Sequence, residues 1–125
     1  MSQRKGTILI IDDDTNIRDA MRDTLEDEGY AVDVASNGAD ALTYLHSHPA
    51  PSLIFLDWNM APMNATQFMA QFCKESAFAH VPVVLITADM KADTKVKTSR
   101  YEGFLRKPIS LDTLFAFASR FAAPA

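Results

Sequence analysis

The sequence predicts an α/β fold in which helices cover both faces of a parallel sheet. Residues 53–56 are four consecutive large apolar residues. Such a run is typical of a strand that is buried on both faces, because a sheet with one wet face shows alternation instead. Residues 7–11 form a second run of this kind. Helical patterns alternate with the strand patterns, as in a chain of βαβ units.

Five strands are expected, at residues 7–11, 31–35, 52–57, 81–86 and 103–106. In the second strand Val32 and Val34 flank the charged Asp33, so one face is partly wet and the strand lies nearer a sheet edge. In the fourth strand Pro82 lacks an amide donor and is acceptable only near the first position.

Five helices are expected to alternate with these strands. The first carries apolar residues at spacings of three and four from Ile17 to Leu25, with Asp14 or Thr15 as its cap and Gly29 at its end. The second covers residues 38–45. The third places four side chains on one face, namely Phe68, Met69, Phe72 and Cys73.

The last two helices differ in their apolar content. Residues 89–100 contain only two large apolar side chains, so this fourth helix is expected to be loosely held. The final helix begins after a Ser110 cap. Its expected sheet-facing residues are Leu111, Leu114, Phe115, Ala118 and Phe121.

Composition excludes several classes of protein. A chain of 125 residues with 48% hydrophobic content forms one domain, residues 1–125. The net charge of −4, without a run of Lys or Arg, argues against direct nucleic-acid binding. No apolar run approaches the roughly 18 to 20 residues that span a bilayer, and the polar start is not a signal peptide. We therefore expect a cytoplasmic protein without membrane insertion.

Several familiar catalytic motifs are absent from the sequence. Neither phosphate-binding glycine motif follows the first strand, and no serine lies in a Gly-x-Ser-x-Gly elbow. The single Cys73 excludes an intramolecular disulfide and a cysteine zinc site. The three histidines lie away from the strand ends, so a serine or cysteine hydrolase is not expected.

Polar residues instead follow the carboxyl ends of four strands. Asp12, Asp13 and Asp14 follow the first strand, and Asp57 ends the third. Thr87 and Lys107 follow the fourth and fifth. Parallel strands bring these ends to one edge, where carboxylates and a cation can hold a hard divalent cation beside a phosphoryl group. Taken alone, Asp57 would more simply begin a turn, and Asp14 is interpreted as a helix cap.

Together these motifs resemble the receiver domain of bacterial two-component response regulators. The resemblance covers nearly the whole chain and rests on Ile11-Asp12-Asp13, Leu56-Asp57, Ile86-Thr87-Ala88 and Lys107-Pro108. The run Asp57-Trp58-Asn59-Met60 is similar to the chemotaxis-type single-domain regulators. The resemblance implies a doubly wound, flavodoxin-like sheet of five strands in the order 2-1-3-4-5. No linker follows Phe121, so a stand-alone receiver is expected.

The resemblance also implies a role for each site residue. Asp57 would accept a phosphoryl group from a sensor histidine kinase, a histidine phosphotransfer protein or a small acyl phosphate. Mg²⁺ would be held by Asp13, Asp57 and the main-chain carbonyl of Asn59, with Asp12 acting mainly through water. Lys107, Thr87 and Ala88 would bind the phosphoryl oxygens. Thr87 and Phe104 would then switch a face that binds a downstream protein, so the chain is a signalling switch and not an enzyme.

Three departures from the family pattern fall near this site. They are the loop Met60-Ala61-Pro62, a spacing from Thr87 to Lys107 that is about two residues short, and Arg100-Tyr101 before the last strand. Asn59 and Asp89 are expected to flank the phosphoryl group and to permit its loss within seconds to minutes. Two alternatives are a phosphate-independent docking module with the same fold and a phosphatase of the haloacid dehalogenase type. The phosphatase motif Asp-x-Asp-x-Thr would begin at Asp12 and require Thr at position 16, where this chain has Asn16.

Overall fold

The computed structural model describes residues 6–60, 63–88 and 101–122 of the chain. Five parallel strands form one sheet in the order β2-β1-β3-β4-β5. The strands are β1 (Thr7–Ile11), β2 (Ala31–Ala35), β3 (Leu53–Asp57), β4 (Val83–Thr87) and β5 (Tyr101–Arg106). The predicted fold class and strand order are therefore confirmed.

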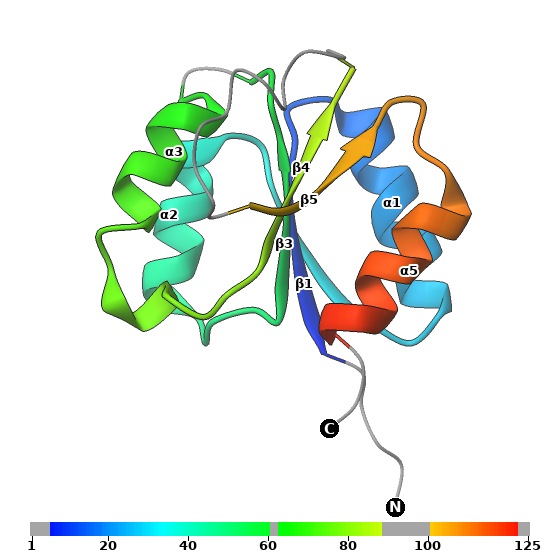
Figure 1. The fold of residues 1–125 in the computed structure, drawn as a ribbon, viewed down its shortest axis with the longest axis horizontal. Helices are drawn as coiled ribbons and strands as arrows, with labels where there is room; N and C mark the ends of the chain where they lie inside the picture. Colours follow the sequence, from blue (N-terminus) through cyan, green and yellow to red (C-terminus); the bar gives the residue numbers. More distant parts are fainter. Residues whose placement is uncertain (1–5, 61–62, 89–100, 123–125) are drawn as a thin grey trace, which may run out of the picture.

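Helices cover both faces of the sheet (Figure 1). The helices α1 (Thr15–Asp27) and α5 (Leu111–Ala122) lie on one face, and α2 (Gly38–Ser47) and α3 (Ala65–Phe72) lie on the other. A short 3-10 helix follows α3 at Ser76–Phe78. The fourth predicted helix, residues 89–100, lies outside the described residues, so four of the five predicted helices are observed. In the described part, no helix is both long and apolar enough to cross a bilayer.

The core lies in two layers, one on each side of the sheet. Successive residues of a strand point to opposite faces, so Leu9 and Ile11 pack toward α2 and α3 while Ile8 and Ile10 pack toward α1 and α5. Every residue of β3 is buried. Because both faces are covered by helices, the ends of the central strands are held in fixed positions.

Side-chain caps fix where the helices begin. The Asp14 side chain accepts hydrogen bonds from the amides of Asn16 and Ile17, which confirms its prediction as the cap of α1. At the end of α1, Gly29 has a φ of 97°, a conformation that only glycine adopts without strain. In α3, Asn64 and Gln67 exchange hydrogen bonds as a capping box. Of these residues, Asp14 and Asn64 define the loops that follow β1 and β3 on the site edge.

Some predicted positions differ in the structure. β4 begins at Val83, because Pro82 has no amide to donate, although its carbonyl still accepts from Ile54 at 3.0 Å. β5 begins at Tyr101, two residues earlier than predicted.

Two side chains that lie on predicted apolar helix faces are exposed. Leu111, the first residue of α5, is 54% exposed and has no preceding turn to pack beneath it. Cys73 is exposed because α3 ends at Phe72 and Cys73 is only its cap. Both residues therefore match the apolar pattern of their helix but lie at its end, Leu111 as the first residue of α5 and Cys73 as the cap of α3.

Candidate functional site

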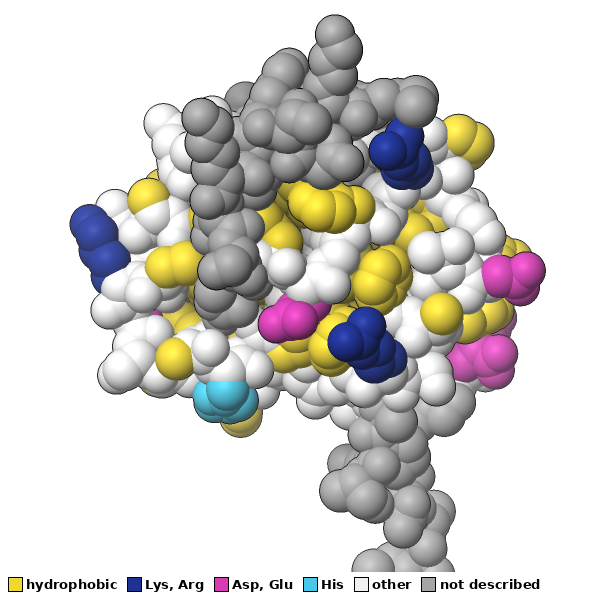
Figure 2. Space-filling view, in the orientation of Figure 1, with side chains coloured by type: hydrophobic (Ala, Val, Ile, Leu, Met, Phe, Trp, Pro, Cys, Tyr) yellow, Lys and Arg dark blue, Asp and Glu magenta, His cyan; other side chains and the backbone are white. Residues whose placement is uncertain are grey.

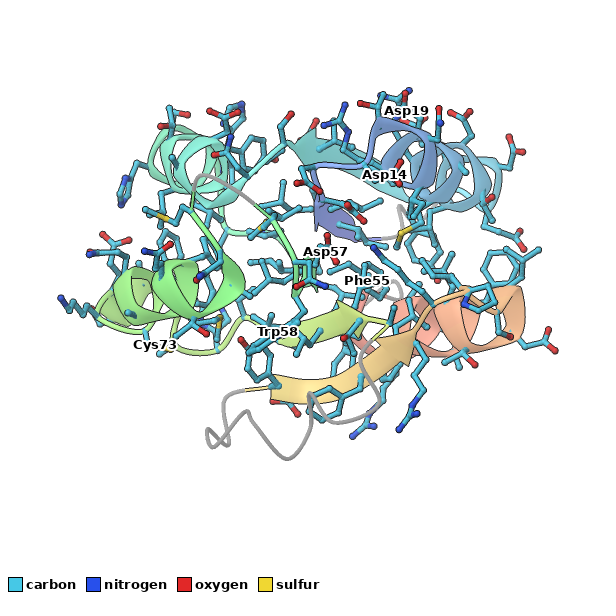
Figure 3. The ribbon with its side chains drawn as sticks, turned by 90° about the horizontal axis from the view of Figure 1, so that it is seen from above. Asp14, Asp19, Phe55, Asp57, Trp58 and Cys73 are labelled. Carbon is cyan, nitrogen blue, oxygen red and sulfur yellow. The ribbon has the colours of Figure 1, made fainter. Side chains whose placement is uncertain are left out.

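The predicted site residues converge at the carboxyl edge of the sheet. Ile11 pairs with Leu56, and Asp57 pairs with Ile86, so the ends of β1, β3 and β4 are level. Figure 3 views this edge from above, and Asp57 lies between the two layers of helices. Residues that are up to 95 positions apart in the sequence, Asp12 and Lys107, are thereby brought into contact range.

Three carboxylates form an acidic cluster at this edge. One oxygen from each of Asp12, Asp13 and Asp57 lies within 4.8 Å of the others. Asp12 is fully buried, Asp57 is 2% exposed, and Asp13 is open to solvent. One Asp12 oxygen accepts from the Asp14 amide at 2.9 Å, whereas Oδ2 is buried without a hydrogen-bond partner among the described residues. A buried oxygen of this kind carries a desolvation cost that a cation offsets.

Lys107 supplies a positive charge to the cluster. Its Nζ lies 3.2 Å from Oδ1 of Asp57 and 3.9 Å from Oδ2 of Asp12. The backbone holds Lys107 in place, because its amide donates to the Thr87 carbonyl at 2.9 Å. The side chain is 22% exposed, so it borders solvent while its ammonium group reaches the buried carboxylates. Lys107 is therefore held against the acidic cluster and is not a freely solvated lysine.

The electrostatics of the cluster leave negative charge in excess. Burial, and then the neighbouring Asp12, raise the pKa of Asp57 to about 7, although Lys107 acts in the opposite direction. The pKa of Asp12 is also raised, chiefly by burial, against the hydrogen bond from Asp14 and the charge of Lys107. One ammonium group thus faces three carboxylates. An oxygen-only set with excess negative charge fits a hard cation such as Mg²⁺.

An open cavity adjoins the acidic cluster. It measures about 440 Å³, and Asp13 and Asn59 both line it, with Trp58, Met60, Asn64 and Thr66. The Trp58 amide donates to the Ile86 carbonyl at 2.8 Å, so the backbone after Asp57 is tied to β4. The cavity meets the acidic cluster at Asp13, and its volume is large enough for a phosphoryl group and water.

The remaining predicted residues lie on β4 and β5. Thr87 is the last residue of β4 and is 4% exposed, and Ala88 follows it at the surface. Phe104 is 37% exposed, with its ring centroid 6.3 Å from that of Tyr101. Phe104 therefore lies outward in this structure. Asp89, Ala61 and Pro62 lie outside the described residues.

One residue beside the site was not predicted from the sequence. Arg18, on α1, is a largely buried arginine whose Nη1 donates to Ser36 Oγ at 2.8 Å and to the Asp12 carbonyl at 3.5 Å. Its position between Ile17 and Asp19 gives no sequence signal, because most arginines on an amphipathic helix are exposed.

Comparison with known proteins gives one consistent family. The model of the response regulator receiver domain matches residues 8–119. The chain is 30% identical to the chemotaxis protein CheY of Pseudomonas aeruginosa, over 86% of this chain and 88% of that protein. It is 30% identical to response regulator Rre1 of Synechocystis, over 94% of this chain and 52% of that protein. The chain thus spans about half the length of Rre1.

Solved structures have the same fold. Chemotaxis response regulator CheY4 of Vibrio cholerae superposes with a TM-score of 0.84, at 26% identity, over 96% of this chain and 99% of that one. Response regulator TrrA of Thermotoga maritima, solved in complex with Mg²⁺ and BeF, superposes with a TM-score of 0.80, at 26% identity, over 92% of this chain and 97% of that one.

Proposed function

This chain belongs to the family of response regulator receiver domains, and on that basis we propose that it is a phosphoacceptor in two-component signalling, with Asp57 as the phosphorylated residue. The observation that carries the proposal is the contact between the buried Asp57 carboxylate and Lys107, at 3.2 Å, beside two further carboxylates. Among the clustered acids, Asp57 alone is the last residue of a strand and has an oxygen within 3.2 Å of the Lys107 ammonium group.

Mg²⁺ is the proposed cofactor of this site. Asp13, Asp57 and the main-chain carbonyl of Asn59 would hold it directly, and Asp12 would act mainly through water. When bound, the ion would offset the negative charge of the carboxylates and of the incoming phosphoryl group. The buried Oδ2 of Asp12 and the oxygen-only donor set support this assignment. The complex of TrrA with Mg²⁺ and BeF is a precedent in a similar structure.

Phosphoryl transfer would use the Asp57 carboxylate as the nucleophile. A carboxylate oxygen forms a bond to phosphorus while the bond from phosphorus to the donor breaks, and the electron pair leaves with the donor nitrogen or oxygen. Lys107 would stabilise the negative charge on the acyl phosphate. The Thr87 hydroxyl and the Ala88 amide would donate to the remaining phosphoryl oxygens. The donor would be a sensor histidine kinase, a histidine phosphotransfer protein or a small acyl phosphate.

The output would pass through β5. Added charge on Asp57 would draw Thr87 toward the phosphoryl group, and Phe104 would turn inward into the space that Thr87 leaves. The outward position of Phe104, at 37% exposure, is the starting state that this change requires. The partner at the output face would be a downstream protein. The chain would act in the cytoplasm as a switch and would catalyse only its own phosphorylation and dephosphorylation.

Neither alternative function is favoured. A docking module that had lost the switch would not need Asp12, Asp13, Asp57 and Lys107 to remain clustered. The family match leaves no support for a phosphatase of the haloacid dehalogenase type.

Intact-mass measurement after incubation with acetyl phosphate and Mg²⁺ tests the proposal. The wild type should gain one phosphoryl mass, and Asp57→Asn should gain none. Asp14→Asn is a matched control, because it removes a nearby carboxylate but keeps a helix-capping side chain. It should be labelled like the wild type. Comparable labelling of Asp57→Asn would sink the assignment.

A further inference from the structure

Arg18 lies on α1, directly behind the loop that carries the acidic cluster. Its side chain is 14% exposed, which is unusual for an arginine on the outer layer of an α/β domain. Arg22, one turn later on the same helix, is 35% exposed. Both arginines have a nitrogen 3.7 Å from Oδ1 of Asp19. Their shared contact with Asp19 therefore does not explain why the Arg18 side chain is less exposed than that of Arg22.

The contacts of the Arg18 guanidinium are with the ends of two neighbouring strands. Nη1 donates to Oγ of Ser36, the residue after β2, at 2.8 Å. The same nitrogen donates to the main-chain carbonyl of Asp12, the residue after β1, at 3.5 Å. The Asp12 amide also donates to the carbonyl of Ala35 at 3.1 Å. Arg18 thus extends the pairing of β1 and β2 beyond the last backbone hydrogen bond.

These contacts hold the backbone of the acidic loop, and they do not neutralise its carboxylates. The Asp12 carboxylate faces Lys107 and Asp57, whereas Arg18 contacts the Asp12 carbonyl. Nε of Arg18 is buried without a hydrogen-bond partner in the described part of the chain. Burial of an incompletely bonded guanidinium costs free energy, so this placement is costly on grounds of stability alone.

On the basis of the function proposed above, we infer that Arg18 is a positioning residue for the magnesium site. By joining Ser36 to the Asp12 carbonyl, it fixes the direction in which Asp12 and Asp13 present their carboxylates. Mg²⁺ requires near-ideal octahedral geometry, so a small rotation of this loop weakens binding even when every ligand is present. Residues that orient metal ligands commonly account for a 10- to 100-fold difference in metal affinity.

Magnesium titration of matched variants tests this inference. Binding is followed by the fluorescence of Trp58, and independently by the rise in Tm that Mg²⁺ produces. Arg18→Met should raise the Kd for Mg²⁺ roughly tenfold. Arg22→Met removes the same charge from the same helix and should leave the Kd within about twofold of wild type, since exposed charges are screened. Arg18→Lys should recover part of the loss, because lysine reaches one acceptor but lacks the planar fork.

Ser36→Ala provides a milder variant with the same prediction. It removes one end of the contact without a buried charge and should raise the Kd by about threefold. The double variant Arg18→Met with Ser36→Ala should bind no more weakly than Arg18→Met alone, because both act through one contact. If far-UV circular dichroism shows that Arg18→Met is unfolded, the Ser36→Ala result decides.

Different failures would overturn different statements. An unchanged Kd in Arg18→Met, or in Ser36→Ala where Arg18→Met is unfolded, overturns the role of Arg18. An equal loss in Arg22→Met does so too, because it would assign the effect to net charge. In both cases the proposed function stands, provided that the wild type binds Mg²⁺ and Asp13→Ala does not. A wild type that shows no Mg²⁺ response by either readout overturns the proposed metal site, and this inference with it.

Discussion

The strands β3 and β5 both end at the site, but their surroundings are opposite. All five residues of β3 are buried, and it pairs with β1 on one side and β4 on the other. In β5 only Leu105 is buried, and the strand pairs with β4 alone among the described strands. Figure 2 shows apolar side chains gathered on the face of the molecule where β5 lies in Figure 1.

This difference in burial indicates that β3 is held in place by the core, whereas β5 can move more easily. Asp57, the proposed phosphoacceptor, belongs to a strand that cannot shift without opening both core layers. The β4–β5 pairing contains a register irregularity between Val83 and Val84, and all residues of β5 except Leu105 are partly or fully exposed. Segments with few buried contacts open at low free-energy cost. We therefore propose that phosphorylation occurs at the end of β3 and that β5 carries the structural response.

Removal of Lys107 should have the largest effect on the chemistry. Its ammonium group is the cation beside Asp57, so Lys107→Ala should slow phosphorylation by acetyl phosphate at least about 100-fold. Arg106→Ala removes an exposed charge from the adjacent position of β5 and is the control. The time course of intact-mass labelling measures both rates. Equal rates in the two variants would mean that the β5 end contributes no specific contact.

Two phenylalanine variants compare the stability of the strands directly. Phe55→Ala empties a fully buried position in β3 and should lower the free energy of unfolding by about 3–5 kcal/mol. Phe104→Ala, at 37% exposure in β5, should lower it by less than about 1 kcal/mol. Urea unfolding gives both values. A similar loss in the two variants would contradict the contrast between the strands.

The raised pKa of Asp57 predicts how stability depends on pH. Its pKa is about 7 in the folded protein, against 3.8 as the ordinary value. The folded state therefore retains a proton that the unfolded chain releases, so stability falls as pH rises from about 4 to about 7. Asp57→Asn avoids this loss and should be more stable than wild type at pH 8, by on the order of 2 kcal/mol.

Urea unfolding across this pH range measures the effect. The advantage of Asp57→Asn should vanish near pH 3, below the pKa of Asp57 in both states, where the wild-type carboxyl is largely protonated whether folded or unfolded. Saturating Mg²⁺ at pH 8 should narrow the gap by stabilising the wild type. A variant that is less stable than wild type at pH 8 without metal would show that Lys107 outweighs burial.

The smallest predicted effect concerns loss of the phosphoryl group. Asn59 lines the cavity that adjoins the acidic cluster at Asp13, and its side chain is short enough to admit a water molecule for in-line attack. Asn59→Met should slow dephosphorylation by about fivefold, from a wild-type lifetime of seconds to minutes. Thr66→Met, in the same cavity, controls for crowding in general. Intact mass after removal of the phosphodonor gives the lifetime, and a wild-type lifetime of hours would contradict the prediction.

The same contrast explains how far the sequence alone could be interpreted. β1 and β3 are buried on both faces, so their apolar runs predicted them closely, together with Asp12 and Asp57 at their ends. The prediction missed the first two residues of β5, Tyr101 and Glu102, because they do not form an apolar run. β5 is an edge strand among the described strands and is partly exposed to solvent, so its sequence shows only a weak strand pattern.

Other features depended on contacts that a single sequence does not encode. Leu111 and Cys73 matched a helical stripe but lie at helix ends, where the packing that the stripe implies has stopped. Arginine is a residue type usually found at the surface. Arg18 finds acceptors only because the pairing of β1 with β2 places Asp12 and Ser36 side by side. By contrast, the capping box of Asn64 and Gln67 could have been predicted, because the two residues stand three positions apart just before an apolar helical pattern.

Amide hydrogen exchange tests the separation of chemistry from response most directly. The wild type is compared with and without acetyl phosphate and Mg²⁺, and Asp57→Asn is treated in the same way. We predict that peptides covering β5 change their exchange on phosphorylation, that peptides covering β1 and β3 do not, and that Asp57→Asn shows neither change. Unchanged exchange in β5 of the phosphorylated wild type, or an equal change in β3, would contradict the account.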